Sequence, residues 1–205
     1  DDAKEYLQNI ITNDINKVSN INSIFAALLS PQGKYLFDFF VVKDDNGYLL
    51  DCDGSSIKEL LKNLSKYKIR SKVEIKDVSS NYVVGIINFE NFKVIQKEIR
   101  SNELTLKYRE SSIFVDPRDN DLGARMISSL EKLYLTIKKL KLKIVKNNSY
   151  LEKAFLKGVP IEGLNNLQNQ LFGLEVNFEK LNAIDFKKGC YVGQENTARM
   201  KLKNK

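Results

Sequence analysis

The sequence predicts an α+β fold with mixed, mostly antiparallel sheets. One observation is that short apolar runs are joined by tight-turn signals, Pro31-Gln32-Gly33 and Asn46-Gly47, which are typical of antiparallel hairpins. A second is that Ile and Leu recur over residues 57–64 at the spacing of one helical face. The resulting order of strand, helix, strand and strand indicates an α+β module.

The elements of the N-terminal half follow from these patterns. Tyr6, Leu7 and Ile10 share one face of a predicted first helix. Ser55 and Ser56 are expected to cap the helix that follows them. We expect, in order, a helix over 3–12, strands over 24–29, 35–42 and 48–52, a helix over 57–64, and strands over 72–78 and 82–89, with the first two strands paired as a hairpin.

The C-terminal half gives fewer clear signals, and the segments 90–110 and 129–146 stay unassigned. Gly158 and Pro160 mark the end of a helix, because glycine is common just past a helix end and proline cannot continue one. The predicted elements are a hairpin of strands over 112–115 and 124–127, a helix over 150–157, and a helix that begins near Gly193.

Length and charge bound the class of protein. The 205 residues suffice for one large or two small domains. We expect one region, 1–205, with two interleaved α+β modules, one centred on about 46–111. No apolar run approaches the roughly 20 residues of a membrane span, so no membrane partner is expected.

The net charge of +7 would suit an anionic partner. The lysines are spread along the whole chain and interleaved with acids, so nucleic acid is not an expected partner. An RNA-binding module stays as a third hypothesis that only the charge supports.

The absence of His excludes a Ser-His-Asp triad, a Cys-His pair within the chain and every His-ligated metal site. Two cysteines, Cys52 and Cys190, cannot build a Cys-rich metal site, so no metal-ligand set is predicted. Two cysteines without a signal for secretion fit a reducing compartment.

The strongest local signal is the segment 187–195, Lys-Lys-Gly-Cys-Tyr-Val-Gly-Gln-Glu. Glycines on both sides of Cys190 let the backbone turn sharply or approach a ligand closely. Lys187, Lys188 and the positive end of a following helix would favour the thiolate over the thiol. Such a cysteine can be a nucleophile, a redox centre or a metal ligand. The alternative is an inert, buried Cys in a turn, and the residues alone leave the two about equal.

Three other side chains are candidates. Cys52 lies between two aspartates, which would raise its pKa, so we interpret it as structural. Asp38 interrupts the apolar run 36–41. A buried carboxylate needs a partner or a function, so we favour function over a solvated strand face. The local sequence around Glu175 favours an ordinary solvated side chain.

The segment from Lys188 to Glu195 resembles the K-G-C-[FY]-x-G-Q-E signature of YgfZ-type proteins, which are relatives of the glycine-cleavage T-protein. Weaker matches follow the family's order over nearly the whole chain. They are Tyr6-Leu7-Gln8 with Thr12-Asn13-Asp14-Ile15, Ser30-Pro31-Gln32-Gly33-Lys34 leading to Asp38, Asp116-Pro117-Arg118 with Leu122-Gly123 and Arg125, Gly158-Val159-Pro160, and Ala198-Arg199.

The resemblance implies a T-protein/YgfZ-like folate-binding fold, tetrahydrofolate or a derivative as cofactor, and a role in iron–sulfur cluster assembly or repair, with tRNA modification as a related process. It maps folate contacts onto Asp38, Glu175 and Arg118; a carboxylate suits the pterin, whose edge presents adjacent N–H donors. It makes Cys190 the catalytic residue, within a motif completed by Lys188, Gly189, Tyr191, Gly193, Gln194 and Glu195.

The resemblance also implies partners and a location. The partners are folate and iron–sulfur assembly proteins or client enzymes. Because one thiolate is too few to hold a cluster, any cluster at Cys190 should be shared and labile. The bacterial cytoplasm is the first expected location and the mitochondrial matrix the second.

The alternative function is a tetrahydrofolate-dependent aminomethyltransferase of the glycine cleavage type. The T-protein carries paired acids where this chain has Phe37-Asp38, and it has no match for Cys190. These differences favour an accessory protein over a turnover enzyme. The family's C-terminal barrel would follow Arg199, so the region is expected to lack it.

Overall fold

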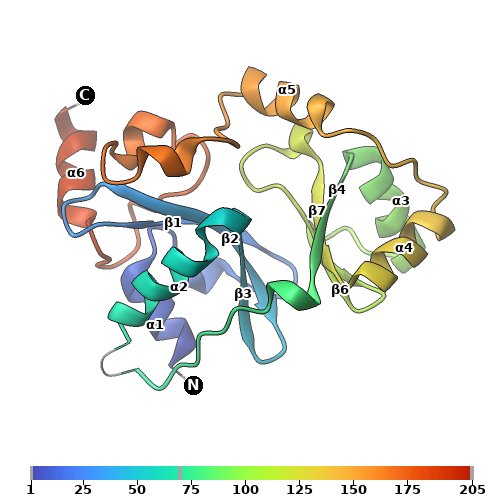
Figure 1. Ribbon diagram of the computed structural model, residues 1–205, viewed down its shortest axis with the longest axis horizontal. Coiled ribbons are helices and arrows are strands. Elements are labelled where there is room, and N and C mark those ends of the chain that lie inside the picture. Colours follow the sequence, from blue (N-terminus) through green and yellow to red (C-terminus); the bar gives the residue numbers. More distant parts are fainter. Residues whose placement is uncertain (1, 69–70, 204–205) are drawn as a thin grey trace.

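The computed structural model describes residues 2–68 and 71–203. Over these residues it contains a three-stranded sheet in the order β1-β2-β3 and a four-stranded sheet in the order β4-β7-β6-β5. Figure 1 shows the first sheet at the left with α1 and α2, and the second at the right with α3 and α4. Every strand pair is antiparallel. The predicted α+β class with antiparallel sheets is therefore confirmed.

The first sheet packs one face against α1 and α2. Phe37, Phe39 and Val41 alternate along β2 and point into this core, where they meet Leu7 and Leu60 from the two helices. The elements are α1 (Ala3–Ile10), β1 (Ile24–Leu29), β2 (Tyr35–Asp44), β3 (Gly47–Cys52) and α2 (Ile57–Lys66).

The second sheet packs against α3 and α4 through a core that includes Phe92, Ile113 and Met126. Here the unassigned segments 90–110 and 129–146 supply α3, β5 and α4. The elements are β4 (Val83–Ile87), α3 (Phe89–Ile99), β5 (Thr105–Tyr108), β6 (Ser111–Val115), β7 (Ala124–Ser128) and α4 (Leu130–Lys139).

A third core joins the two sheets to the C-terminal part of the chain. Phe25 and Phe40 come from the first sheet, Phe114 and Ile127 from the second, and Phe178 from a C-terminal loop. The C-terminal helices are α5 (Asn148–Leu156) and α6 (Gln194–Lys203), and Figure 1 shows α6 at the far end of the first sheet from α3 and α4. The inner faces of both sheets thus meet one shared core.

Two local predictions were wrong. The segment 72–78 alternates like a strand, but it is extended without pairing. Its alternation reflects packing, because Val73 and Ile75 contact the core of the first sheet. Ser56 makes no capping hydrogen bond; the Asp53 side chain instead accepts one from Ser55 N, at 2.8 Å, one turn before α2.

Candidate ligand-binding site and the Cys190 loop

A cavity of about 240 Å³ lies between the two sheets. Asp38, Asp51 and Cys52 line it from the first sheet, and Ile86 and Arg125 line it from the second. The rest of its wall includes Asp53, Arg118, Tyr150, Pro160 and Ile161. The structure therefore brings together Asp38 and Arg118, two residues that the sequence singled out and that lie 80 positions apart.

Asp38 reaches this cavity because of strand alternation. It shares a face of β2 with Phe40 and Val42, which belong to the core between the sheets. The Tyr35 hydroxyl donates a hydrogen bond to Asp38 Oδ1 at 2.6 Å. Burial raises the pKa of the Asp38 carboxyl, and the Tyr35 hydrogen bond acts in the opposite direction. The result is a partly buried carboxyl group that can accept hydrogen bonds from a ligand in the cavity.

Two guanidinium groups lie against the ring of Phe40. Arg118 Cζ is 4.7 Å and Arg125 Cζ is 4.6 Å from its centroid, within cation–π range. Asp116 binds Arg118 at two atoms, with Nε–Oδ1 at 3.0 Å and Nη2–Oδ2 at 2.7 Å. Asp51 accepts a 2.7 Å hydrogen bond from Arg125 Nε. Because each arginine already has its own carboxylate, both groups stay fixed when no ligand is bound.

Cys52 forms part of the same wall, at the end of β3. Burial raises the pKa of its thiol to about 12, and the nearby Asp51, Asp38 and Asp53 act in the same direction. The thiol is therefore protonated at neutral pH, which agrees with the interpretation of Cys52 as structural.

The structure does not bring Glu175 to this cavity. Its side chain is exposed and accepts a 2.7 Å hydrogen bond from Phe172 N at the start of the short helical turn Gly173–Val176. The local bond is a helix-capping contact, which explains the carboxylate without a ligand. Of the three predicted folate contacts, the cavity contains Asp38 and Arg118.

Cys190 is exposed, in the loop that leads into α6, and it does not line the cavity. Lys188, one of the two lysines expected to act on this thiol, has its ammonium group bound at another part of the chain. Lys188 Nζ is directed to the carbonyl oxygens of Gln8, Ile11 and Asn13, at 2.7, 2.6 and 3.0 Å. These carbonyls lie in the last turn of α1 and in the three residues after it, so the ammonium group anchors the loop there.

The second glycine of the motif is explained by a close backbone approach. Gly193 has a φ of +83°, and a Cβ on it would lie 2.5 Å from the Ser30 carbonyl oxygen. Asn196 Nδ2 donates to Gln32 O in the same turn, at 2.9 Å. Gly189 has open space around it, and nothing in the structure explains it. The predicted helix after Cys190 is confirmed as α6.

The remaining motif residues lie in the core or in α6. Tyr191 is buried in the core between the sheets. Glu195 forms an exposed ion pair with Arg199 one turn later in α6, at 2.6 Å. Gln194 is the first residue of α6.

The sequence did not identify Tyr35, Arg125 or Tyr150 as site residues. The Tyr150 hydroxyl oxygen accepts a hydrogen bond from Arg118 Nη2 in the cavity wall, at 3.0 Å. Arg125 carried a signal, since it belongs to one of the matched stretches, but its pairing with Asp51 depends on the placement of two separate sheets. No local pattern reports such a contact.

No family model matches the chain. It is 30% identical over 97% of its length to an iron–sulfur cluster assembly factor IBA57 homologue, named as mitochondrial, from Dictyostelium discoideum, and covers 55% of that protein. The homologue from Neurospora crassa is 28% identical over 98% of the chain, which covers 47% of it. The chain thus spans about half the length of these curated relatives.

Among solved structures, the chain is similar to the glycine cleavage system aminomethyltransferase T from Bartonella henselae. The TM-score is 0.54 at 14% identity, over 68% of this chain and 40% of that one. At this identity the likeness shows the fold, which is therefore of the T-protein type. Across residues 2–68 and 71–203, no helix is long and apolar enough to cross a membrane.

Proposed function

We propose that this chain is the folate-binding part of a YgfZ-type accessory factor for iron–sulfur cluster assembly or repair. The observation that carries the proposal is the similarity to named iron–sulfur assembly factors over 97% of the chain. The T-protein-like fold supports the folate part, because the glycine cleavage enzyme shares this architecture.

The residues of the cavity fit the pterin end of a folate. Asp38 provides a carboxyl group for adjacent N–H donors, and Phe40 and Tyr150 provide aromatic surface. The Tyr35 hydroxyl holds the carboxyl group in place. We propose Asp38 as the main polar anchor, with Arg118 as a support of the wall. Tetrahydrofolate, when bound, would supply a carrier for one-carbon groups.

Cys190 is proposed to contact the iron–sulfur cluster as a substrate. Within the described chain, no group of three Cys, Asp or Glu side chains has an arrangement that could hold a metal ion. Clusters usually take four protein ligands, so the others would come from a partner protein or small thiols. The exposure of Cys190 supports such sharing, because a partner can approach the loop directly.

The proposed partners are iron–sulfur assembly proteins or their client enzymes. The relatives named above are called mitochondrial. We therefore propose the mitochondrial matrix, the second of the two expected locations, ahead of a bacterial cytoplasm.

Calorimetric titration with tetrahydrofolate tests the folate site. Asp38→Asn should weaken binding by about 1–3 kcal/mol, the usual cost of losing a charged hydrogen bond in a buried site. Glu175→Gln is the matched control and should bind like the wild type, because its carboxylate only caps a helical turn. Wild-type protein that does not bind tetrahydrofolate would remove the folate part of the proposal.

Complementation of cells that lack the corresponding factor tests the cysteine. Cells complemented with Cys190→Ser should lack the activity of iron–sulfur enzymes. Cells complemented with Cys52→Ser should retain that activity, since Cys52 is a protonated residue of the cavity wall. Iodoacetamide should label Cys190 and spare Cys52 in the folded protein. Full rescue by Cys190→Ser would show that the thiol is not the functional centre.

The fold likeness keeps aminomethyl transfer as a second candidate function. A transferase should turn over lipoyl-bound aminomethyl substrate with tetrahydrofolate many times per protein. We expect no such turnover, because the acid that precedes the matched aspartate in the T-protein is Phe37 here.

A further inference from the structure

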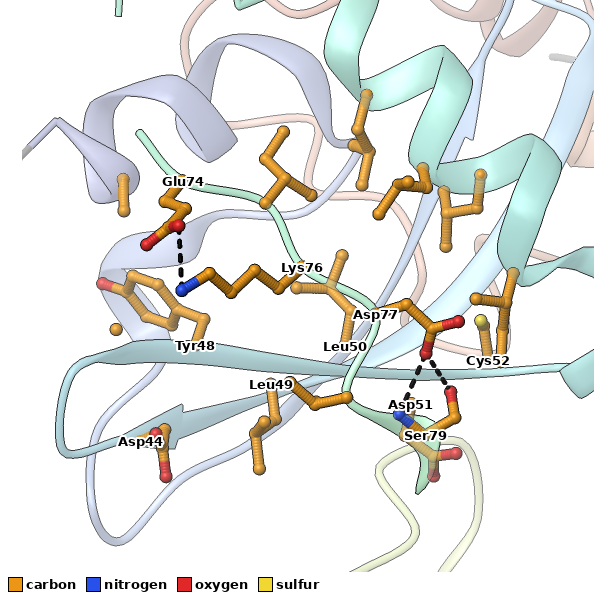
Figure 2. A pocket seen from close by; sticks show the side chains of 18 of the residues that line it. Asp44, Tyr48, Leu49, Leu50, Asp51, Cys52, Glu74, Lys76, Asp77 and Ser79 are labelled. Atoms are coloured by element: carbon orange, nitrogen blue, oxygen red, sulfur yellow. Dashed lines mark hydrogen bonds and ion pairs between the residues drawn. The ribbon is translucent and has the colours of Figure 1, made fainter. Parts of the chain in front are cut away.

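A second, larger cavity lies on the other side of β3, and the proposed function does not use it. Its volume of about 460 Å³ falls within the roughly 300–1,000 Å³ typical of ligand cavities. Figure 2 shows it between the side chains of α2 and strand β3, with the extended segment 73–79 crossing it. Most of its wall is apolar, with Tyr6, Leu50, Leu60, Leu64, Val73 and Val84 as main contributors.

Strand β3 presents a free edge at this cavity. It is the last strand of its sheet and pairs with β2 alone, so every second residue directs its N–H and C=O away from the sheet. Among the described residues, no backbone hydrogen bond joins β3 to the segment 73–79. A free edge of this kind can accept a further strand.

An exposed apolar stripe that begins just before β4 and continues along it faces the same cleft. Tyr82, Val84 and Ile86 alternate along the chain and are 38%, 43% and 39% exposed. Val84 pairs in register with Ile127 and Ile86 with Arg125, so the stripe lies on the face of the second sheet that is turned toward the first. The stripe connects the two cavities, since Val84 lines the larger and Ile86 the smaller.

The rim of the larger cavity is acidic although the chain carries a net charge of +7. Asp44 and Asp77 form no ion pair within the part of the chain that the structure describes. Hydrogen bonds from Ser79 lower the pKa of Asp77 and keep it ionised. Figure 2 shows Glu74 paired with Lys76 beside Tyr48. Two carboxylates without an ion-pair partner in the described chain would attract a cationic occupant.

We propose that this cavity binds an extended segment of a partner protein, which adds to β3 as a fourth strand. Its apolar side chains would pack between α2 and the β4 stripe, and a Lys or Arg would approach Asp44 and Asp77. This is strand addition, in which main-chain hydrogen bonds give affinity and side-chain pockets give specificity. The inference goes beyond the proposed function. Because Asp51 and Cys52 line both cavities, the occupant would lie against the back of the wall that carries the folate site.

Fluorescence anisotropy with labelled synthetic peptides tests the proposal. The probes are a peptide of alternating Val and Lys, the same peptide with Glu for Lys, and the Val-Lys peptide N-methylated at alternate residues. The Val-Lys peptide should bind about tenfold more tightly than either control, a difference of about 1.4 kcal/mol. The Glu peptide reverses the charge, and N-methylation removes the donors that a strand needs.

Protein variants locate the binding. Asp77→Lys should weaken binding of the Val-Lys peptide about tenfold. Glu131→Lys makes an equal charge change at an exposed position of α4 and should leave the binding unchanged. Val84→Ser should weaken binding, and Leu130→Ser, which removes a 70% exposed leucine elsewhere, should not. Tetrahydrofolate affinity of Asp77→Lys should equal that of the wild type, which keeps this test separate from that of the folate site.

Several outcomes would overturn the proposal. These are equal binding of the N-methylated peptide, equal loss in Asp77→Lys and Glu131→Lys, or no binding below about 1 mM, the affinity of a very weak complex. Sedimentation of the wild type that shows a dimer, abolished by Val84→Ser, would assign the surface to a second copy of this chain instead.

Discussion

At the scale of single residues, the site depends on a carboxyl group that the fold holds at a cost in stability. Asp38 is surrounded by aromatic side chains, and a hydroxyl group, Tyr35, is its one direct side-chain hydrogen-bond partner in the described chain. The Arg118 charge also favours the carboxylate, but desolvation is the larger effect, so holding this carboxyl group costs stability, as is common where a residue is kept for binding.

Asp38→Asn should therefore stabilise the protein at neutral pH. Burial raises the pKa of Asp38, so the folded chain holds the proton more tightly than the unfolded chain. The stability from this group is greatest below the unfolded pKa of about 3.9 and is lost as pH rises through the folded pKa. Thermal melts from about pH 4 to pH 8 should show a difference between Asp38→Asn and wild type that grows with pH. Asp45→Asn, an exposed acid, is the control; a variant that melts lower than the wild type at pH 7 would contradict the explanation.

At the scale of elements, the sequence patterns predicted the turns and helix ends, which are determined by residues close together in the chain. The hairpin at Asn46-Gly47 and the end of α5 at Gly158 are confirmed, because turn and cap residues act over a few positions. The prediction of a strand over 72–78 was wrong, because a strand needs a partner strand, and the pattern of the segment itself does not show whether one is present. The pairing of Arg125 with Asp51 was missed for the same reason.

The contact between the Cys190 loop and the turn 30–33 gives a prediction for the two glycines of the motif. Gly193→Ala should lower the free energy of unfolding by about 1–3 kcal/mol, because the new Cβ would overlap the Ser30 carbonyl oxygen. The left-handed backbone at this position also disfavours alanine. A Cβ at position 189 would lie in open space, so Gly189→Ala should change the free energy of unfolding by less than about 0.5 kcal/mol. Urea denaturation measures both. Equal effects would mean that the turn does not hold the loop.

At the scale of the whole molecule, the cavity that contains Asp38 exists because two sheets are held together by charged groups as well as by a core. The ion pair between Arg125 on β7 and Asp51 on β3 spans them, and both side chains are largely buried, at 16% and 7% exposure. Asp38 and Arg118 were both predicted from the sequence, but only the placement of the sheets shows that they share a cavity.

Removal of one partner of this ion pair should be more damaging than removal of both. Arg125→Leu alone leaves Asp51 buried without its partner and should cost about 2–4 kcal/mol, somewhat below the range for a fully buried pair. The double variant Asp51→Leu, Arg125→Leu should recover much of that loss. Chemical denaturation of the four proteins of this cycle gives the coupling energy, and a value near zero would show that the apolar core alone holds the sheets.

The Lys188 anchor has a consequence for how the protein is made. It joins residues 180 positions apart, from the loop before α6 to the end of α1. Contacts of such long range form late, after the intervening chain has folded. During synthesis α1 and its sheet emerge first, and Lys188 reaches the ribosome exit only when nearly all of the chain described here is outside. The loop that carries Cys190 can therefore be ordered only after the chain from α1 to Lys188 has emerged, so a copy in which α1 is misfolded would not hold the thiol in the position seen here.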